Sequence, residues 1–300
     1  MKLGFFTANL PELSLEELAC FAGEAGFSAI EVACWPGGDT ADRKYAGVCH
    51  IDCDLLDEDE AEKIKSLMKE NSLEISALGY YPNHLDPDPE KRAFFHEHLK
   101  KVMRAANMIG CPLVGTFVGR DPGKNLEENL DDFKKIFTGF LEEAKKLGIR
   151  LIIENCPMMF DGYPGTNFAY SPEIWDRMFS AVPDPELGLN YDPSHLFWQG
   201  IDYIKAIKEF APRIYHVHAK DAEFNHDVLG RVGIYGNGWW RYRMPGQGAI
   251  DWRELIGTLY ESGYDGVISI EHEDPVWEGS TDKIKLGLTL GRRTLANYIA

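Results

Sequence analysis

The sequence has no CxxC pair, no long apolar run and far fewer basic than acidic residues. Lys and Arg number 31 against 48 Asp and Glu, which gives a formal charge of −17 at pH 7. Such a surface repels a phosphate backbone and disfavours a nucleic-acid partner. The apolar runs fall short of the roughly 18 residues that span a membrane, and no apolar signal segment follows Lys2. We therefore expect a cytoplasmic protein that does not act at a membrane.

The cysteines are scattered through apolar stretches, which is typical of reduced, buried thiols. CHIDC at 49–53 has the residue types of a metal cluster, but strand alternation would place Cys49 and Cys53 on one side and His50 on the other. We therefore do not expect a structural zinc there.

The chain also lacks a Ser- or Gly-rich linker that would divide it, and strand-like runs alternate with helical patterns along its whole length. The strand-like runs are 2–7, 29–34, 73–79, 112–117, 150–155, 187–192, 213–219 and 266–272. Helical patterns follow each run, and Ser14-Leu-Glu-Glu has the form of a capping box. Eight βα units predict a single (β/α)₈ TIM barrel over residues 1–300, with long loops after strands five and seven on the catalytic face.

Four metal-ligand side chains stand at the ends of the last four predicted strands: Glu154, Asp192, His218 and Glu271. In a closed barrel these ends converge on one side of the mouth. Isolated charges there are costly unless they are paired or bind a cation, so we expect one divalent metal ion. Three carboxylates and one imidazole favour Mn²⁺, with Mg²⁺, Co²⁺ or Zn²⁺ as alternatives. The competing interpretation is a set of ion-paired rim carboxylates beside a core histidine.

The segments IIEN, YDPSH, HVHAKD, SIEHEDP and PGQGAIDW occur in this order along the barrel pattern. Together they resemble the sugar phosphate isomerase/epimerase superfamily, the xylose isomerase-like barrels, and the resemblance covers essentially the whole chain. The nearest families by these motifs are the inosose dehydratases, hydroxypyruvate isomerases and ketose 3-epimerases. The resemblance implies that the same four residues bind one metal ion, with His195 beside it and Lys220 and Asp221 near the substrate.

The reaction implied by the resemblance is proton transfer on a keto sugar or cyclitol through a metal-stabilised enediolate. In the ketose epimerases the outer pair of glutamates exchanges the proton, which here implies catalytic roles for Glu154 and Glu271. If one glutamate removes the proton and the other returns it to the same carbon, that centre is inverted and the sugar is epimerised. Return of the proton to the next carbon isomerises the sugar, and loss of a β-hydroxyl group dehydrates it. We expect a sugar isomerase or epimerase, with a dehydratase or lyase on a keto sugar or keto-inositol as the alternative.

Further residues are expected around the substrate. His195 follows Pro193, which turns the chain over the mouth, so we expect a substrate or proton-transfer role for it. His216 shares the face of His218 one layer deeper and is expected to lie in the core. Loop 229–248 carries aromatic residues and arginines, as a lid, a barrel plug or an oligomer contact. The predicted substrate-binding residues are Lys220, Asp221, His84, Trp198, Trp239 and Arg243.

Some family features are missing. The ketose epimerases carry a glutamate after the first ligand and an arginine after the metal histidine, where this chain has Phe160-Asp161 and Phe224-Asn225. Asp161 or an arginine of the loop would have to replace those contacts. A glycine-rich phosphate cradle is also absent from the sequence, which favours an unphosphorylated substrate. A nuclease similar to endonuclease IV is disfavoured because its additional histidines are absent, and a non-catalytic sugar-binding barrel would not need all four ligands. The expected partner is a small sugar, and a homo-oligomer is left open.

Overall fold

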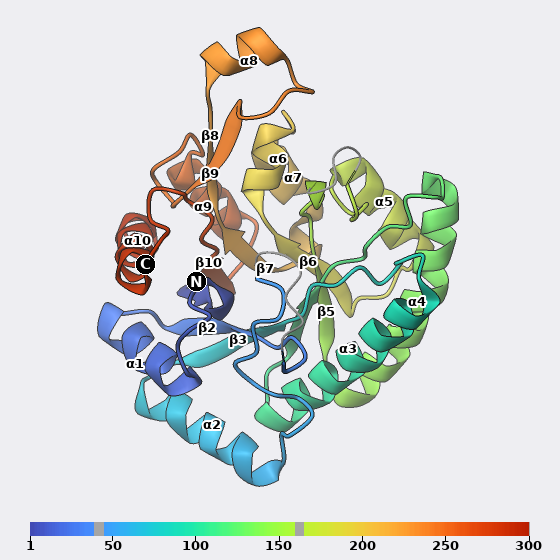
Figure 1. The fold of residues 1–300 in the computed structure, drawn as a ribbon, viewed down its shortest axis with the longest axis vertical. Helices are drawn as coiled ribbons and strands as arrows, with labels where there is room; N and C mark the ends of the chain where they lie inside the picture. The colour runs from blue at the N-terminus through green and yellow to red at the C-terminus, as the bar shows by residue number, and fades with distance from the viewer. Residues whose placement is uncertain (39–44, 160–164, 300) are drawn as a thin grey trace.

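The computed structural model describes residues 1–38, 45–159 and 165–299, in which eight parallel strands close into a barrel with helices around it (Figure 1). Pairing of the first strand with the last, Lys2 opposite Val267, closes the ring. The strands in ring order are β1 (Lys2–Phe6), β2 (Ala29–Ala33), β3 (Glu74–Gly79), β4 (Leu113–Thr116), β5 (Arg150–Glu154), β6 (Leu187–Tyr191), β7 (Ile214–Ala219) and β10 (Val267–Ile270). The predicted (β/α)₈ barrel is confirmed.

The strands form because each is a short apolar run that is covered on both faces. Every residue of β2, β6 and β10 is buried, as expected for parallel strands between a packed interior and an outer layer of helices. Each strand begins or ends within two residues of its predicted boundary. The last residues of the predicted runs, such as Asp192 and Glu271, lie just past the strands at the mouth.

The outer helices follow the strands in the predicted order and have the predicted ends. Ser14 caps the first helix, with Glu17 completing a capping box, and Gly148 ends another helix at a φ of 67° that favours glycine. These helices are α1 (Leu15–Ala25), α2 (Glu58–Glu70), α3 (Pro89–Ile109), α4 (Leu126–Leu147), α5 (Pro172–Ala181), α7 (Tyr203–Phe210), α9 (Trp252–Glu261) and α10 (Thr281–Ala296). None of the helices in the described ranges is long and apolar enough to cross a membrane.

Further short elements shape the catalytic face and were not predicted. Helix α6 (Pro193–Trp198) follows β6 at once, and a hairpin of β8 (Asp221–Phe224) and β9 (Trp240–Arg243) follows β7. Helix α8 (His226–Val232) joins the two hairpin strands and projects away from the barrel (Figure 1). The described ranges also contain the 3₁₀ turns η1 (Thr7–Asn9) and η3 (Ala211–Arg213). Much of the aromatic loop is therefore a paired β-hairpin beside the mouth.

A glycine inside the barrel makes room for one side chain of the site. A Cβ atom on Gly115 of β4 would lie 2.2 Å from the Tyr81 hydroxyl oxygen, so any larger residue would displace that ring. The space lets Tyr81 extend across the interior towards β2. The Tyr81 hydroxyl also accepts a hydrogen bond of 2.9 Å from Asn190 of β6, so this residue, which follows β3, connects strands that stand three places apart in the ring.

Candidate active site and metal centre

The four predicted ligands meet at the mouth of the barrel. Glu154 ends β5, Asp192 follows β6, His218 lies near the end of β7 and Glu271 follows β10. One ligand atom from each residue lies within 4.8 Å of all the others, and all four side chains are buried. The structure therefore brings together the residues that the strand ends predicted to converge.

The unpaired ring nitrogen of His218 supports a metal at this point. Within the described part of the chain, His218 Nδ1 has no hydrogen-bond partner, although it lies 3.4 Å from a Glu271 oxygen and 3.6 Å from a Glu154 oxygen. A buried nitrogen that faces carboxylate oxygens at these separations is costly unless a cation lies between them. Three carboxylates and one imidazole match the donor set of a divalent ion.

A carboxylate on the opposite side of the imidazole sets its orientation. Glu31, from β2, accepts a hydrogen bond of 2.7 Å from His218 Nε2, and Tyr81 donates to the other Glu31 oxygen at 2.6 Å. Burial alone would raise the pKa of Glu31, but His218 lowers it overall, so the carboxylate stays charged. With its proton on Nε2, His218 presents the Nδ1 lone pair to the other ligands, as metal-binding histidines do.

The residues around Asp192 hold that ligand in place. Its Oδ1 accepts hydrogen bonds from the Ser194 backbone N–H at 2.8 Å and from the Ser194 hydroxyl at 2.6 Å. The Asn155 side chain bonds the Asp192 backbone on both sides, at 2.8 and 2.9 Å. Oδ2 is left directed at the cluster, where its nearest cation is the Lys220 ammonium at 3.2 Å. The first residues of α6 thus fix Asp192 Oδ1 and leave Oδ2 available to bind a metal ion.

Lys220 lies inside the acidic cluster. Its ammonium donates to Glu271 Oε2 at 2.6 Å and to Glu273 Oε1 at 3.0 Å, and it lies 4.6 Å from the centre of the Tyr242 ring. Burial would raise the pKa of Glu271, but Lys220 and His218 hold it well below its usual range. Burial and the neighbouring Glu271 raise the pKa of Glu154 to about 7. The two outer carboxylates are therefore inequivalent: Glu271 stays ionised and Glu154 holds a proton near neutral pH.

His195 lies beside two of the four predicted metal ligands. Its Nε2 lies 3.4 Å from Glu154 Oε1 and 3.3 Å from Asp192 Oδ2, and its Nδ1 shares a hydrogen bond of 2.9 Å with the Tyr242 hydroxyl. Burial, with Lys220 nearby, holds the pKa of this imidazole well below its usual range. A neutral imidazole offers a substrate oxygen either an N–H donor or an acceptor nitrogen.

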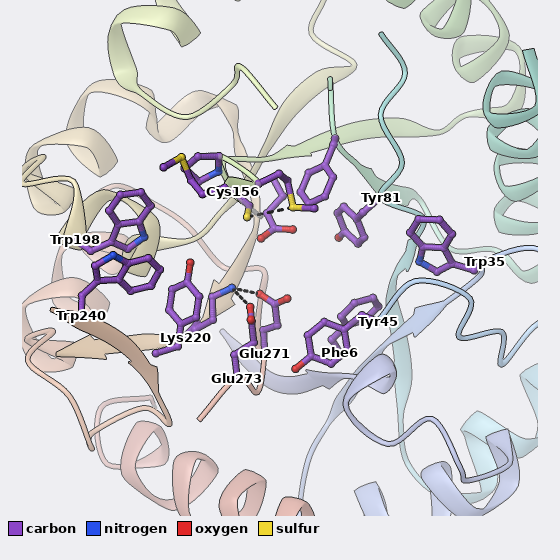
Figure 2. Close-up of a pocket in the computed structure, with 16 residues that line it drawn as sticks. Phe6, Trp35, Tyr45, Tyr81, Cys156, Trp198, Lys220, Trp240, Glu271 and Glu273 are labelled. Atoms are coloured by element: carbon purple, nitrogen blue, oxygen red, sulfur yellow. Dashed lines mark hydrogen bonds and ion pairs between the residues drawn. The ribbon is translucent and has the colours of Figure 1, made fainter. Parts of the chain in front are cut away.

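A cavity of about 220 Å³ opens over the cluster (Figure 2). Its lining is mostly aromatic and apolar, and the charged members are at its base. The lining residues are Phe6, Trp35, Tyr45, Tyr81, Phe117, Glu154, Cys156, Pro157, Met158, Met159, Trp198, Lys220, Trp240, Tyr242, Glu271 and Glu273. Lys220 and Trp198 therefore lie where the sequence placed them, at the pocket.

Asp221 is the first predicted substrate residue that the structure places elsewhere. Its oxygens accept hydrogen bonds from the backbone N–H groups of Ala222, Gly246 and Ile250 and from Trp252 Nε1. All its acceptor capacity is directed at the loop before α9. Asp221 therefore organises this loop and is not among the residues that line the cavity, so its role in substrate binding stays a prediction.

His84, Trp239 and Arg243 likewise do not line the cavity. His84 is fully buried behind β4, where its Nε2 bonds Thr116 Oγ1 at 2.9 Å. Trp239 packs on Phe224, and its neighbour Trp240 faces the cavity instead. The Arg243 guanidinium bonds Asp274 at 3.0 Å and Glu223 at 2.8 Å. The structure thus places these side chains outside the cavity lining, where each packs on or bonds another part of the chain, and their roles in substrate binding stay predictions.

Other sequence expectations have direct structural outcomes. His216 bonds Asn190 Oδ1 and Ser76 Oγ at 2.9 and 3.0 Å beneath His218, as expected for a core position. The proposed replacement contact of Asp161 lies outside the described residues. Sequence reasoning missed Glu31, although a lone acid within the buried run AIEVAC is a visible signal for a partnered charge.

The chain resembles proteins of known fold along its length. The family model described as "Xylose isomerase-like TIM barrel" matches residues 21–292. A Bacillus subtilis protein, the uncharacterized protein YfiH, is 26% identical over 91% of this chain and 93% of its own length. An inosose dehydratase of Lacticaseibacillus casei is 30% identical over 152 residues, and the match spans about half of each protein, 48% of this chain and 49% of the relative.

Two solved structures share the fold. A D-psicose 3-epimerase from Clostridium cellulolyticum H10, solved with D-tagatose, has a TM-score of 0.73 at 15% identity, over 100% of this chain and 99% of its own. The IOLI protein with a bound zinc atom has a TM-score of 0.71 at 19% identity, over 99% of this chain and 96% of its own. Named homologues and neighbours are thus sugar epimerases and dehydratases, one structure holds a divalent metal, and this chain belongs to the xylose isomerase-like TIM barrel family.

Proposed function

We propose that the protein is a divalent-metal-dependent isomerase or epimerase that acts on a keto sugar or cyclitol by proton transfer. The observation that carries this proposal is the convergence of Glu154, Asp192, His218 and Glu271 from four successive strands, with His218 Nδ1 directed at the carboxylates and lacking a hydrogen bond among the described residues. A bound divalent ion would give this nitrogen and the facing carboxylate oxygens a common partner.

The same four residues would hold the ion. Their oxygen-rich donor set favours Mn²⁺, Mg²⁺ or Co²⁺, and the zinc of the IOLI structure supports a divalent ion in this family. When bound, such an ion supplies Lewis-acid stabilisation of negative charge on a substrate oxygen. Lys220 would then shift its contacts from Asp192 towards Glu273, because two cations compete for the same oxygens.

Proton transfer is assigned to the two outer glutamates. They reach the cavity from β5 and β10, so they flank the cluster on two sides. One glutamate can accept the proton from the substrate carbon, and the other can return it from the second side. Such a pair can invert a centre next to a carbonyl or move the carbonyl to the neighbouring carbon.

Dehydration is a second candidate, and one pair of side chains favours it. His195 and Tyr242 share a hydrogen bond beside Glu154, where they could protonate a leaving hydroxyl. The partial match to inosose dehydratases supports the same reaction. Both reactions begin with removal of a proton next to a carbonyl, so this site can serve either.

Incubation in D₂O tests the proposal. The protein is purified, its metal content is measured, and it is incubated with Mn²⁺ and a panel of ketoses and keto-inositols. Deuterium incorporated without loss of water supports the isomerase or epimerase, and an enone absorbance supports the dehydratase. A protein that binds no metal and gives neither signal contradicts both.

A further inference from the structure

Helix α8 lies at the end of an arm that leaves the barrel after β7. The hairpin strands β8 and β9 form the base of this arm, and the residues between them, 226–238, are here called the arm tip (Figure 1). None of the seven residues of α8 is buried. An isolated helix shorter than about 12 to 15 residues is only marginally stable in water, so α8 is expected to gain stability from a further contact.

The arm tip exposes apolar side chains that are close together in the chain. Val232, Ile234 and Tyr235 are 41%, 67% and 89% exposed. Val228 is half-buried and stands four residues before Val232, so the two valines share one face of α8. Single exposed apolar residues are ordinary on a protein surface, but a contiguous set on a projecting element indicates a surface that another protein covers.

Backbone hydrogen bonds give the arm tip a defined shape. The Gly233 N–H donates to the Leu229 carbonyl oxygen at 2.9 Å and ends the helix, and the Gly236 N–H donates to the Gly233 carbonyl oxygen at 3.2 Å. A Cβ atom on Gly236 would lie 2.3 Å from the Val232 Cβ atom, so this close turn requires glycine. A preformed surface loses little conformational entropy on association.

The charges of α8 are complementary to those of a second copy of the chain. Asp227 and Arg231 stand four residues apart, so they share a face of the helix next to the two valines. Neither forms an ion pair within the described part of the chain. If two α8 helices pack antiparallel about a twofold axis, Asp227 of one protomer lies opposite Arg231 of the partner subunit, and the same pair recurs by symmetry.

The charge of the whole chain also favours contact at this place. The chain carries −17, so two copies repel each other through most of their surface, whereas residues 226–238 contain one Asp and one Arg and are neutral when the histidine is uncharged. The arm projects away from the barrel and keeps the acidic barrels apart (Figure 1). We propose that the protein forms a twofold dimer through antiparallel contact of α8 and the apolar residues of the arm tip. This inference goes beyond the proposed function and does not depend on it.

The size of the arm tip sets the expected affinity. A standard stable interface uses about 20 to 30 residues on each side, which is more than the arm tip offers, so we expect a reversible dimer with a Kd in the micromolar range. Sedimentation velocity in low-salt buffer at roughly 1 to 300 µM protein should therefore show a shift from monomer to dimer. A chain that stays monomeric over this range overturns the inference.

Charge reversals test the antiparallel pairing. Asp227→Arg and Arg231→Asp each place like charges opposite one another at two symmetric positions, and we expect each variant alone to dimerise at least about tenfold more weakly. An equimolar mixture of the two variants places Arg opposite Asp at both positions, so it should form dimers as the native protein does. A mixture that stays monomeric although the native protein dimerises overturns the α8 contact.

Apolar substitutions test the rest of the arm tip. Ile234→Asp and Tyr235→Asp should each weaken the dimer by about tenfold or more, because a buried carboxylate without a partner is costly. Leu55→Asp is the matched control, since Leu55 is 78% exposed on the segment before α2, and this variant should dimerise as the native protein does. Thermal melts verify that each variant is folded. A dimer that persists in both folded tip variants is built by another surface and overturns the inference.

Discussion

Two sets of side chains line the barrel mouth and are held by different forces. Charged residues stand at the ends of β5, β7 and β10, here called the charged half, and aromatic residues stand at the ends of β1 to β4, here called the aromatic half. In the charged half each side chain is fixed by a hydrogen bond or ion pair, such as Ser194 on Asp192 and Lys220 on Glu271. In the aromatic half, ring packing fixes Trp35 and Phe117. The comparison teaches that ring packing and charge pairing can be changed one at a time, although Tyr81 joins the two halves by donating to Glu31, the partner of His218.

The largest effect is expected from a substitution in the charged half. Glu154→Gln removes a proton carrier and a metal ligand together, and we expect substrate deuterium exchange to fall by roughly 10²- to 10⁴-fold. Glu186→Gln, which alters a surface ion pair with Arg150, is the matched control and should exchange at the native rate. Exchange at near-native rate in Glu154→Gln would remove this residue from the mechanism.

The pH dependence of the metal-free protein provides the next largest effect. The pKa of Glu154 is raised to about 7 from an ordinary 4.5, so the folded state holds this proton more tightly than the unfolded state. The resulting stability is present below pH 4.5 and is lost as the pH rises through about 7, on the order of 3 kcal/mol. Urea unfolding at pH 4.5 and 7.5 should show this loss in the native protein, and a smaller one in Glu154→Gln. An identical pH profile in both proteins would contradict the assignment.

A third test changes Glu31 of β2, which supports the charged half through His218. Glu31→Gln keeps the shape but removes the negative charge behind His218, and we expect Mn²⁺ affinity to fall by about 10- to 100-fold. Calorimetric titration measures this directly, with Glu74→Gln, a partly exposed acid that pairs with Lys2, as the control. Unchanged affinity would mean that His218 does not need its buried partner.

The smallest effect is expected from Arg243, and it tests whether this residue contacts the substrate. Arg243→Gln should leave substrate affinity unchanged within twofold, because its guanidinium is already bound by Glu223 and Asp274 away from the cavity. A loss of about 1 kcal/mol in stability is expected from the broken hydrogen bonds. A large rise in KM at unchanged stability would restore Arg243 as a substrate contact.

The sequence predicted what depends on local pattern and chain order. Apolar runs predicted the eight strands, and helical patterns with their caps predicted the helices between them. Because strand ends converge in a barrel, the sequence also predicted that Glu154, Asp192, His218 and Glu271 lie close together. The β8–β9 hairpin escaped prediction because its strands are four residues each and joined by a long connection that includes α8. Nothing in their spacing reveals that Ala222 lies opposite Tyr242.

What the sequence did not predict concerns contacts between residues that are distant in sequence. Glu31 and His218 are 187 residues apart, so their hydrogen bond follows only from closure of the barrel. Asp221 and Arg243 were predicted to contact substrate because of their type and place, but the structure gives each of them protein partners instead. Whether a polar residue near the mouth faces the cavity or another part of the chain depends on such distant contacts, which one sequence does not show.

The central claim is that one divalent ion binds where β5, β6, β7 and β10 end. Crystals soaked in Mn²⁺ and measured at the manganese absorption edge test it most directly. The account predicts one strong anomalous peak at roughly 2.0–2.3 Å from oxygens of Glu154, Asp192 and Glu271 and from His218 Nδ1. A map without a peak there, with the Lys220 ammonium still between Asp192 and Glu271, would contradict it.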